Sequence, residues 1–308
     1  AASDVYKRQP LAAGHLPAKL NVMRALTRVA ALTAAAIVTV TSATAYPASA
    51  QPGGNVVVFG DSFASNPDQY RDTALKFFNR WGSSTSSTRI HESARSQAGC
   101  LQGPNNWPSQ LGARTHSAVA DWSCTGHRSK DLPGHVDHAI RAGALNGHTR
   151  AVTFAVGISD QWRPFIDGES SDPQHIRARY LQNIQDAAAK VRAVAPEATI
   201  IIPGLLSITG GGQLCGLNVV PNAPLGVPAP RVAEWEQRAQ NDQRAAARLI
   251  GATFIDIRAL SADHSTCAKD ADRWVAGIID TTTPGYNMAL HPSNAGSAFV
   301  ADQVAQAL

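Results

Sequence analysis

The sequence lacks the cysteine and histidine spacings that mark common metal sites, and its 308 residues include only four cysteines. Neither a C-x-x-C nor an H-E-x-x-H pattern occurs, so no zinc site of those types is indicated. His135 and His138 are the only histidines at helical spacing, and we expect them to lie on a solvated helix face. We therefore expect no metal and no organic cofactor.

Net charge is also absent once the first 50 residues are set aside. Residues 51–308 contain 22 basic and 22 acidic residues, so the net charge of +4 comes from residues 1–50. Nucleic acids and anionic membranes attract proteins with an excess of cations on one face. A formally neutral chain gives no support for either partner.

The N-terminal region contains an apolar run that is too short to span a bilayer comfortably, Val29 to Val40. A basic segment precedes this run, and Ala48-Ser49-Ala50 follows it with the small-x-small pattern of a cleavage site. We interpret residues 23–50 as a secretory signal peptide cleaved after Ala50; the alternative is an N-terminal membrane anchor. Residues 1–22 precede Met23 and are interpreted as a non-native extension. We expect residues 51–308 to form one secreted domain without a membrane span.

All four cysteines lie in this region, and an exported protein meets oxidising conditions. Four cysteines allow three pairings. Proximity in the sequence favours Cys100–Cys124 and Cys215–Cys267, each closing one long loop.

Strand and helix patterns alternate along the domain, which predicts βαβ units and a parallel sheet. The predicted strands cover residues 55–59, 88–93, 150–156, 199–202 and 253–257. The predicted helices cover residues 68–81, 131–145, 173–194, 232–250 and 298–308. Residues 98–110 are expected to form a loop, and residues 207–230 and 263–286 do not fit the alternation. The first irregular stretch is either a substrate-facing loop or a surface excursion tethered through Cys215.

The strongest chemical signal is a serine directly after the first predicted strand. Val56 to Phe59 suit a strand buried on both faces, and Gly60 permits a sharp turn before Ser62. Asp61 or Ser62 can cap a helix that opens near Asp68. Open α/β sheets bind ligands at the carboxyl ends of their strands. His291 lies near the far end of the chain, and the two side chains are candidates for nucleophile and base.

Two further segments can supply hydrogen-bond donors for an oxyanion. Ser123-Cys124-Thr125-Gly126 contains a glycine whose backbone N–H can approach a ligand closely. Ser159 follows the predicted strand at residues 150–156.

With these motifs the chain resembles the SGNH hydrolases, also called GDSL esterases and lipases, and most closely their secreted actinobacterial members. In that family Gly-Asp-Ser contains the nucleophile, a later glycine and the asparagine of Gly-x-Asn-Asp complete the oxyanion hole, and Asp-x-x-His supplies acid and base. The resemblance covers residues 55–308, and no G-x-S-x-G elbow of the α/β-hydrolases is present. It implies a flavodoxin-like, three-layer α/β/α sandwich with a five-stranded parallel sheet. It also implies Ser62 and His291 as catalytic residues, and Ser62, Gly126 and Ser159 as the oxyanion hole.

Two positions depart from the family pattern. Ser159 stands in place of the asparagine, and a hydroxyl is a shorter and more freely rotating donor than a carboxamide. Met288 stands in place of the aspartate and cannot orient an imidazole. The N–H of His291 must therefore find a backbone carbonyl, a water or a distant carboxylate such as Asp280, which would make the site a Ser–His dyad.

The resulting hypothesis is a secreted, monomeric serine esterase or lipase acting on small-molecule, lipid or glycan esters. One alternative is a cell-envelope acyltransferase that uses the same acyl-enzyme with a different acceptor. The other is a catalytically degenerate member of the family that binds glycan or lipid without turnover.

Overall fold

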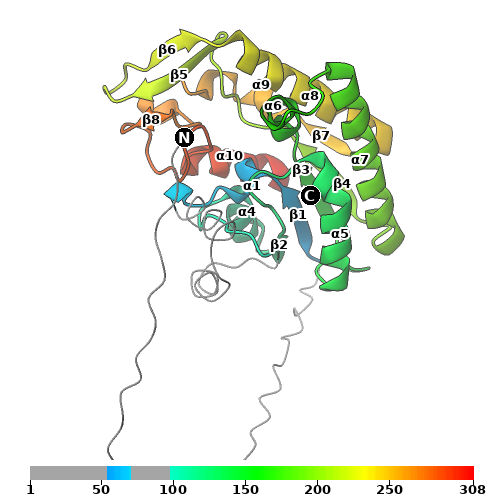
Figure 1. The fold of residues 1–308 in the computed structure, drawn as a ribbon. Helices are drawn as coiled ribbons and strands as arrows, with labels where there is room; N and C mark the ends of the chain where they lie inside the picture. Colours follow the sequence, from blue (N-terminus) through cyan, green and yellow to red (C-terminus); the bar gives the residue numbers. More distant parts are fainter. Residues whose placement is uncertain (1–53, 71–97) are drawn as a thin grey trace, which may run out of the picture. The chain divides into compact units, whose positions relative to one another are not determined.

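The central element is a parallel sheet of five strands in the order β2-β1-β3-β4-β7 (Figure 1). The computed structural model describes residues 54–70 and 98–308. The strands of this sheet are β1 (Val56–Gly60), β2 (Val119–Asp121), β3 (Ala151–Ala155), β4 (Thr199–Pro203) and β7 (Thr253–Ile255). The predicted α/β/α sandwich with a five-stranded parallel sheet is confirmed.

Helices cover both faces of the sheet. They are α1 (Ser62–Ser65), α4 (Trp107–Thr115), α5 (Leu132–Arg141), α6 (Ile158–Asp167), α7 (Pro173–Val194), α8 (Pro230–Ile250), α9 (Ile257–Leu260) and α10 (Asn294–Ala305), with short 3-10 turns at Ser129–Asp131, Ala262–His264 and Asp270–Asp272. None of these helices is both long and apolar enough to cross a membrane.

The two cores follow from the alternation of side chains along β1. Val57 and Phe59 point to one face and pack with apolar residues of α5, α7 and α8. Val56 and Val58 point to the other face and pack with residues of α4 and α10. All five residues of β1 are buried, as expected for a strand enclosed between two helical layers.

Several predicted boundaries were wrong near helix caps. Residues 98–110 are not all loop, because Asn106 caps a helix that begins at Trp107 with proline in its first turn. The last strand ends at Ile255, since Asp256 caps α9. The last helix begins at Asn294, where the Ser293 side chain accepts a hydrogen bond from Gly296 N–H.

One strand of the described sheet was not predicted. It is the three-residue strand β2, which pairs with β1 through Val56–Val119 and Val58–Asp121 and is too short to give a periodic pattern. The predicted strand at residues 88–93 and most of the predicted helix at residues 68–81 lie outside the described residues. Asp61 does cap a helix, but that helix begins at Ser62 rather than near Asp68.

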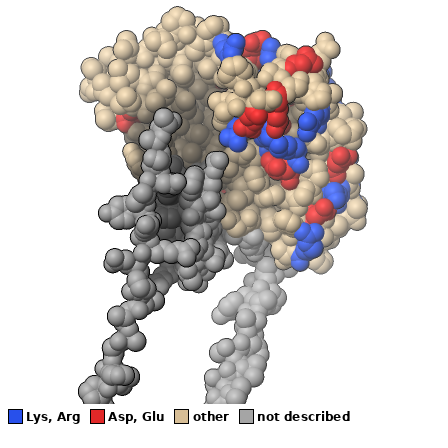
Figure 2. All heavy atoms as spheres, viewed as in Figure 1, with Lys and Arg blue, Asp and Glu red and all other residues tan. Residues whose placement is uncertain are grey.

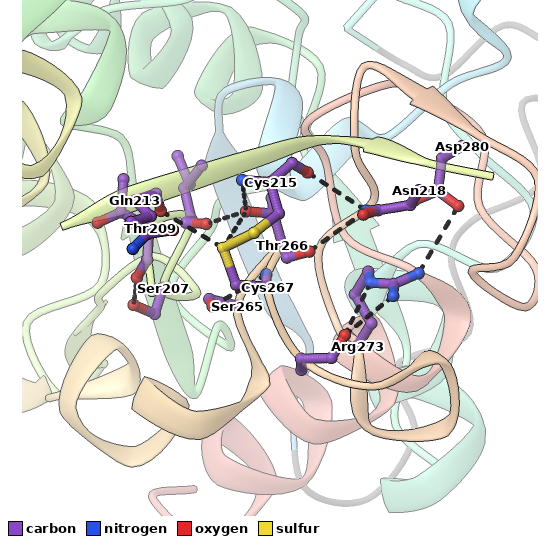
Figure 3. Close-up of a disulfide and its surroundings, with 12 residues drawn as sticks. Ser207, Thr209, Gln213, Cys215, Asn218, Ser265, Thr266, Cys267, Arg273 and Asp280 are labelled. Atoms are coloured by element: carbon purple, nitrogen blue, oxygen red, sulfur yellow. Dashed lines mark hydrogen bonds and ion pairs between the residues drawn. A yellow bond between two sulfur atoms is a disulfide. The ribbon is translucent and has the colours of Figure 1, made fainter. Parts of the chain in front are cut away.

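The two irregular stretches form a second, small sheet in the order β6-β5-β8. Its strands are β5 (Gln213–Asn218), β6 (Leu225–Pro228) and β8 (Ile279–Asp280). The Cys215–Cys267 disulfide joins β5 to the segment beneath it, and Asn218 bonds both Thr266 and Asp280 (Figure 3). A bridge closing a loop of this size stabilises a fold by roughly 2–4 kcal/mol.

Candidate active site

Ser62 is the first residue of α1 and directly follows the turn after β1. The Asp61 side chain accepts a hydrogen bond from Phe63 N–H at 2.9 Å, which caps the helix. Gly60 is required because a Cβ at this position would lie 2.4 Å from the Cβ of Ala64. The turn therefore leaves Ser62 at the N-terminus of a short helix, with its hydroxyl at the carboxyl edge of the sheet.

His291 lies beside Ser62 although 229 residues separate the two in the chain. The distance from His291 Nε2 to Ser62 Oγ is 2.7 Å, and His291 Nδ1 lies 2.8 Å from the carbonyl oxygen of Ala289. A carbonyl oxygen only accepts hydrogen bonds, so the proton belongs on Nδ1. Nε2 then presents a lone pair to the Ser62 hydroxyl, as general-base chemistry requires.

The backbone at Leu290 brings the Ala289 carbonyl to the imidazole. Leu290 has a φ of 60°, an uncommon conformation for a leucine. Its N–H bonds the carbonyl oxygens of Ala276 and Gly277, which holds the turn in place. The Phe63 ring lies 4.9 Å from the imidazole, centroid to centroid, and fixes it from the side.

A second connection joins the Ser62 helix to the His291 loop. Asn66 ends α1 with a left-handed φ of 38°, and its Nδ2 donates to the carbonyl oxygen of Pro292 at 2.9 Å. Asn287 Nδ2 donates in return to the carbonyl oxygen of Asn66. This connection was not predicted. Its one signal in the sequence is an asparagine four positions after the serine, a residue type that often ends helices in the left-handed conformation.

Asp280 does not take the place of the missing family aspartate. Its carboxylate accepts hydrogen bonds from Gly277 N–H at 2.7 Å and from the Thr283 hydroxyl at 2.7 Å. Burial alone would raise the pKa of Asp280, but the bonds from Gly277, Thr283 and Asn218 outweigh it and lower that pKa below its usual value. Asp280 thus fixes the loop that leads to His291, and Ala289 supplies the oxygen at Nδ1.

The other two predicted site residues lie after the strands that flank β1. Gly126 has a φ of +86° and lies in the turn after β2, and no atom of the described residues lies within 4 Å of a Cβ built at this position. Ser65 Oγ and Thr125 Oγ1, 3.2 Å apart, join this turn to the Ser62 helix. Ser159 follows β3, as predicted, and is buried in the first turn of α6. Asp160 next to it accepts bonds from the Ser129 N–H and hydroxyl.

Both predicted disulfide pairs are joined in the structure, Cys100 to Cys124 and Cys215 to Cys267. The sulfurs of Cys100 and Cys124 lie within 4.8 Å of a ring nitrogen of His127, but disulfide sulfurs are not the thiolates that bind metals. His135 is half-buried against His127, with ring centroids 4.1 Å apart, so only His138 of the predicted pair is solvated. Burial, and next the neighbouring His135, lowers the pKa of His127 to about 4.

The fold is thus an α/β/α sandwich in which Ser62 and His291 meet at the carboxyl edge of the parallel sheet. Residues 58–299 match the model of the GDSL-like Lipase/Acylhydrolase family. Lipase 2 of Streptomyces coelicolor is 26% identical over 322 residues, covering 92% of this chain and 98% of that protein.

Solved structures share the fold. Phospholipase A1 from Streptomyces albidoflavus has a TM-score of 0.50 at 18% identity, with 81% of this chain and 98% of that chain covered. The extracellular lipase from Streptomyces rimosus has a TM-score of 0.50 at 17% identity, with 83% and 100% covered. A catalytic mutant of the acetylxylan esterase Axe2 from Geobacillus stearothermophilus has a TM-score of 0.51 at 14% identity, with 82% and 93% covered. The chain belongs to the GDSL-like lipase/acylhydrolase family, and it is a carboxylic-ester hydrolase.

Burial of Asp61 makes stability depend on pH. Burial raises the pKa of Asp61 from 3.8 to about 7, against the bond from Phe63 N–H, which lowers it. The unfolded chain ionises Asp61 near pH 4 and the folded protein only near pH 7, so stability falls as pH rises through this window. Asp61→Asn retains a capping oxygen and should raise the free energy of unfolding at pH 8 by up to about 4 kcal/mol, with little change at pH 4. Urea unfolding at both pH values measures this.

The matched control is Asp172→Asn, which replaces the exposed carboxylate that caps α7. Its effect on the free energy of unfolding should not grow by that amount between pH 4 and pH 8. An Asp61→Asn effect of the same size at both pH values would contradict burial of an ionisable Asp61.

Proposed function

We propose that the protein hydrolyses esters through an acyl-enzyme on Ser62, with His291 as general base. The 2.7 Å contact between His291 Nε2 and Ser62 Oγ is the observation that carries this proposal. As Oγ attacks the acyl carbon, Nε2 takes its proton, and the resulting imidazolium protonates the leaving alkoxide. Water activated by the same Nε2 then attacks the acyl-enzyme and releases the acid.

The Ala289 carbonyl performs part of the role that a carboxylate has in a catalytic triad. It fixes the Nδ1–H tautomer and the ring orientation, because a carbonyl oxygen can accept a hydrogen bond from Nδ1–H but cannot donate one. As a neutral dipole it stabilises the imidazolium less than a carboxylate would. We infer a Ser–His dyad in which the imidazole keeps the orientation that a triad would give it, while its imidazolium form is stabilised less.

The oxyanion of the tetrahedral intermediate needs several donors at once. The N–H of Ser62 is free of helical partners because it lies in the first turn of α1. Among the described residues, no oxygen accepts from the N–H of Gly126. These two N–H groups and the Ser159 hydroxyl are the proposed donors. Ser62 follows β1, Gly126 follows β2 and Ser159 follows β3, and these three strands are neighbours in the sheet.

We also propose that the protein is secreted. The N-terminal segment at residues 23–50 has the pattern of a signal peptide. Two disulfides among the described residues suit an oxidising compartment.

Turnover of p-nitrophenyl acetate, butyrate and palmitate tests the proposed mechanism. Ser62→Ala should remove nearly all turnover on each ester, and His291→Ala should lower kcat by at least about 1,000-fold. Circular dichroism checks that both variants are folded. Undiminished turnover in a folded Ser62→Ala protein would show that another residue is the nucleophile.

Exchanges at Ser159 test its role as a donor. Ser159→Asn should keep or raise kcat, because a carboxamide is a better-placed donor than a hydroxyl. Ser159→Ala should lower kcat, though by less than the roughly 100- to 1,000-fold loss typical of an oxyanion donor. If Ser159 only supports the first turn of α6, Ser159→Ala will change Tm and leave kcat per folded molecule unchanged.

A further inference from the structure

The small sheet is mixed, with β5 antiparallel to β6 and parallel to β8, and one of its faces exposes aliphatic side chains to solvent. A solvated sheet face normally carries polar side chains. The register pairs Leu217 with Leu225 on one side and with Ile279 on the other, so these three side chains form a row across β6, β5 and β8. Val227 lies two residues from Leu225 and points to the same face. Their exposed fractions are 38%, 60%, 60% and 59% for Leu217, Leu225, Ile279 and Val227. We call these four side chains the aliphatic patch.

The opposite face of the small sheet is occupied. A Cβ at Gly226, between Leu225 and Val227, would lie 2.8 Å from Cys215 Sγ, so this side faces the disulfide. The disulfide and the bonds of Asn218 hold the sheet against the rest of the domain (Figure 3). The aliphatic patch is therefore the outer face of a fixed platform.

The surroundings of the patch carry little charge. Residues 198–230, which include β5 and β6, contain no Asp, Glu, Lys, Arg or His. Figure 2 shows the end of the molecule over β5 and β6 almost without charged side chains, whereas charges gather over the helices on the other side of the view. At the rim, Asp270 bonds the backbone of Asn222, and Lys269 stands beside it. Such a surface complements an uncharged or zwitterionic partner.

The patch is continuous with the segment that contains His291. The segment from Val275 to Pro292 contains both Ile279 of β8 and His291. At its two ends, Ala276 N–H bonds the His291 carbonyl oxygen and Val275 pairs with Pro292. A partner bound at the patch is thus held next to the loop of the proposed base.

A second copy of the chain is a less suitable partner. The small sheet has two edge strands: β8 has only two residues, and β6 ends at Pro228 and follows Pro224. Proline has no N–H to donate, and proline on an edge strand opposes pairing.

We propose that the aliphatic patch docks the enzyme on the surface of a zwitterionic lipid aggregate. Docking itself follows from the patch, and this inference rests on the proposed function only where it says that the bound lipid is hydrolysed. Insertion of the patch among the headgroups removes aliphatic surface from water and brings the active site to ester molecules in the aggregate.

Binding of Ser62→Ala protein to phosphatidylcholine vesicles, measured by flotation, tests docking without hydrolysis. Adding Leu225→Asp and Val227→Asp should lower the partition coefficient at least about 100-fold, since two aliphatic contacts are lost and two charges added. The matched control is Leu249→Asp, which changes a 48% exposed leucine on α8 and should leave partitioning within about twofold. With Ser62 restored, the double variant should hydrolyse p-nitrophenyl acetate within about twofold of the unaltered enzyme.

Circular dichroism and a milder variant, Leu225→Gln with Val227→Gln, keep the test independent of folding. The proposal is overturned if the Ser62→Ala protein does not bind phosphatidylcholine, or if the folded double variants bind as well as it does. Binding that needs phosphatidylglycerol and disappears in salt would also overturn it. A dimer in sedimentation that the Asp variant dissociates would assign the patch to a second copy. None of these results depends on whether Ser62 is the nucleophile.

Discussion

The proposed chemistry depends on one imidazole held between two oxygens. His291 donates from Nδ1 to the Ala289 carbonyl and faces the Ser62 hydroxyl with Nε2, at 2.8 and 2.7 Å. The contact with Ser62 joins residues far apart in the sequence, because His291 lies in the C-terminal loop and Ser62 lies in α1, directly after the turn that follows the first strand. The left-handed conformation of Leu290 and the hydrogen bond from Asn66 to Pro292 hold that loop in position beside α1.

Buried carboxyl groups fix the turns around this pair. Asp61, Asp121 and Asp160 follow or end the three adjacent strands β1, β2 and β3, and each accepts hydrogen bonds that hold its turn. Burial raises the pKa of Asp61 to about 7, of Asp121 to about 6 and of Asp160 to about 6. Ionisation of a buried carboxyl group lowers the free energy of unfolding. These three carboxyl groups therefore fix the turns at the site at some cost in folding stability.

The sequence was sufficient to predict the three layers of the fold and the proximity of Ser62 and His291 at the edge of the sheet. The long helix at residues 173–194 has clear helical periodicity and was predicted with the bounds that the structure shows. The strand after Asn55 is a continuous apolar run, which predicted β1 to within one residue at each end. The strand β2, the helix starting at Trp107 and the small sheet were missed. β2 has only three residues and gives no period, and the glycines and prolines near Trp107 and in residues 207–230 indicated loops instead. Met288 indicated that the usual carboxylate was missing, but only coordinates could show that Ala289 supplies the replacement oxygen.

Covalent trapping tests the central claim, a Ser62 nucleophile activated by His291, most directly. The unaltered enzyme would be treated with an activated phosphonate ester, which phosphonylates serine nucleophiles, and digested for peptide mass spectrometry. The account predicts one adduct, on the peptide that contains Ser62, forming at least about 100-fold more slowly in His291→Ala. An adduct on another residue, or equal rates of Ser62 labelling with and without His291, would contradict it.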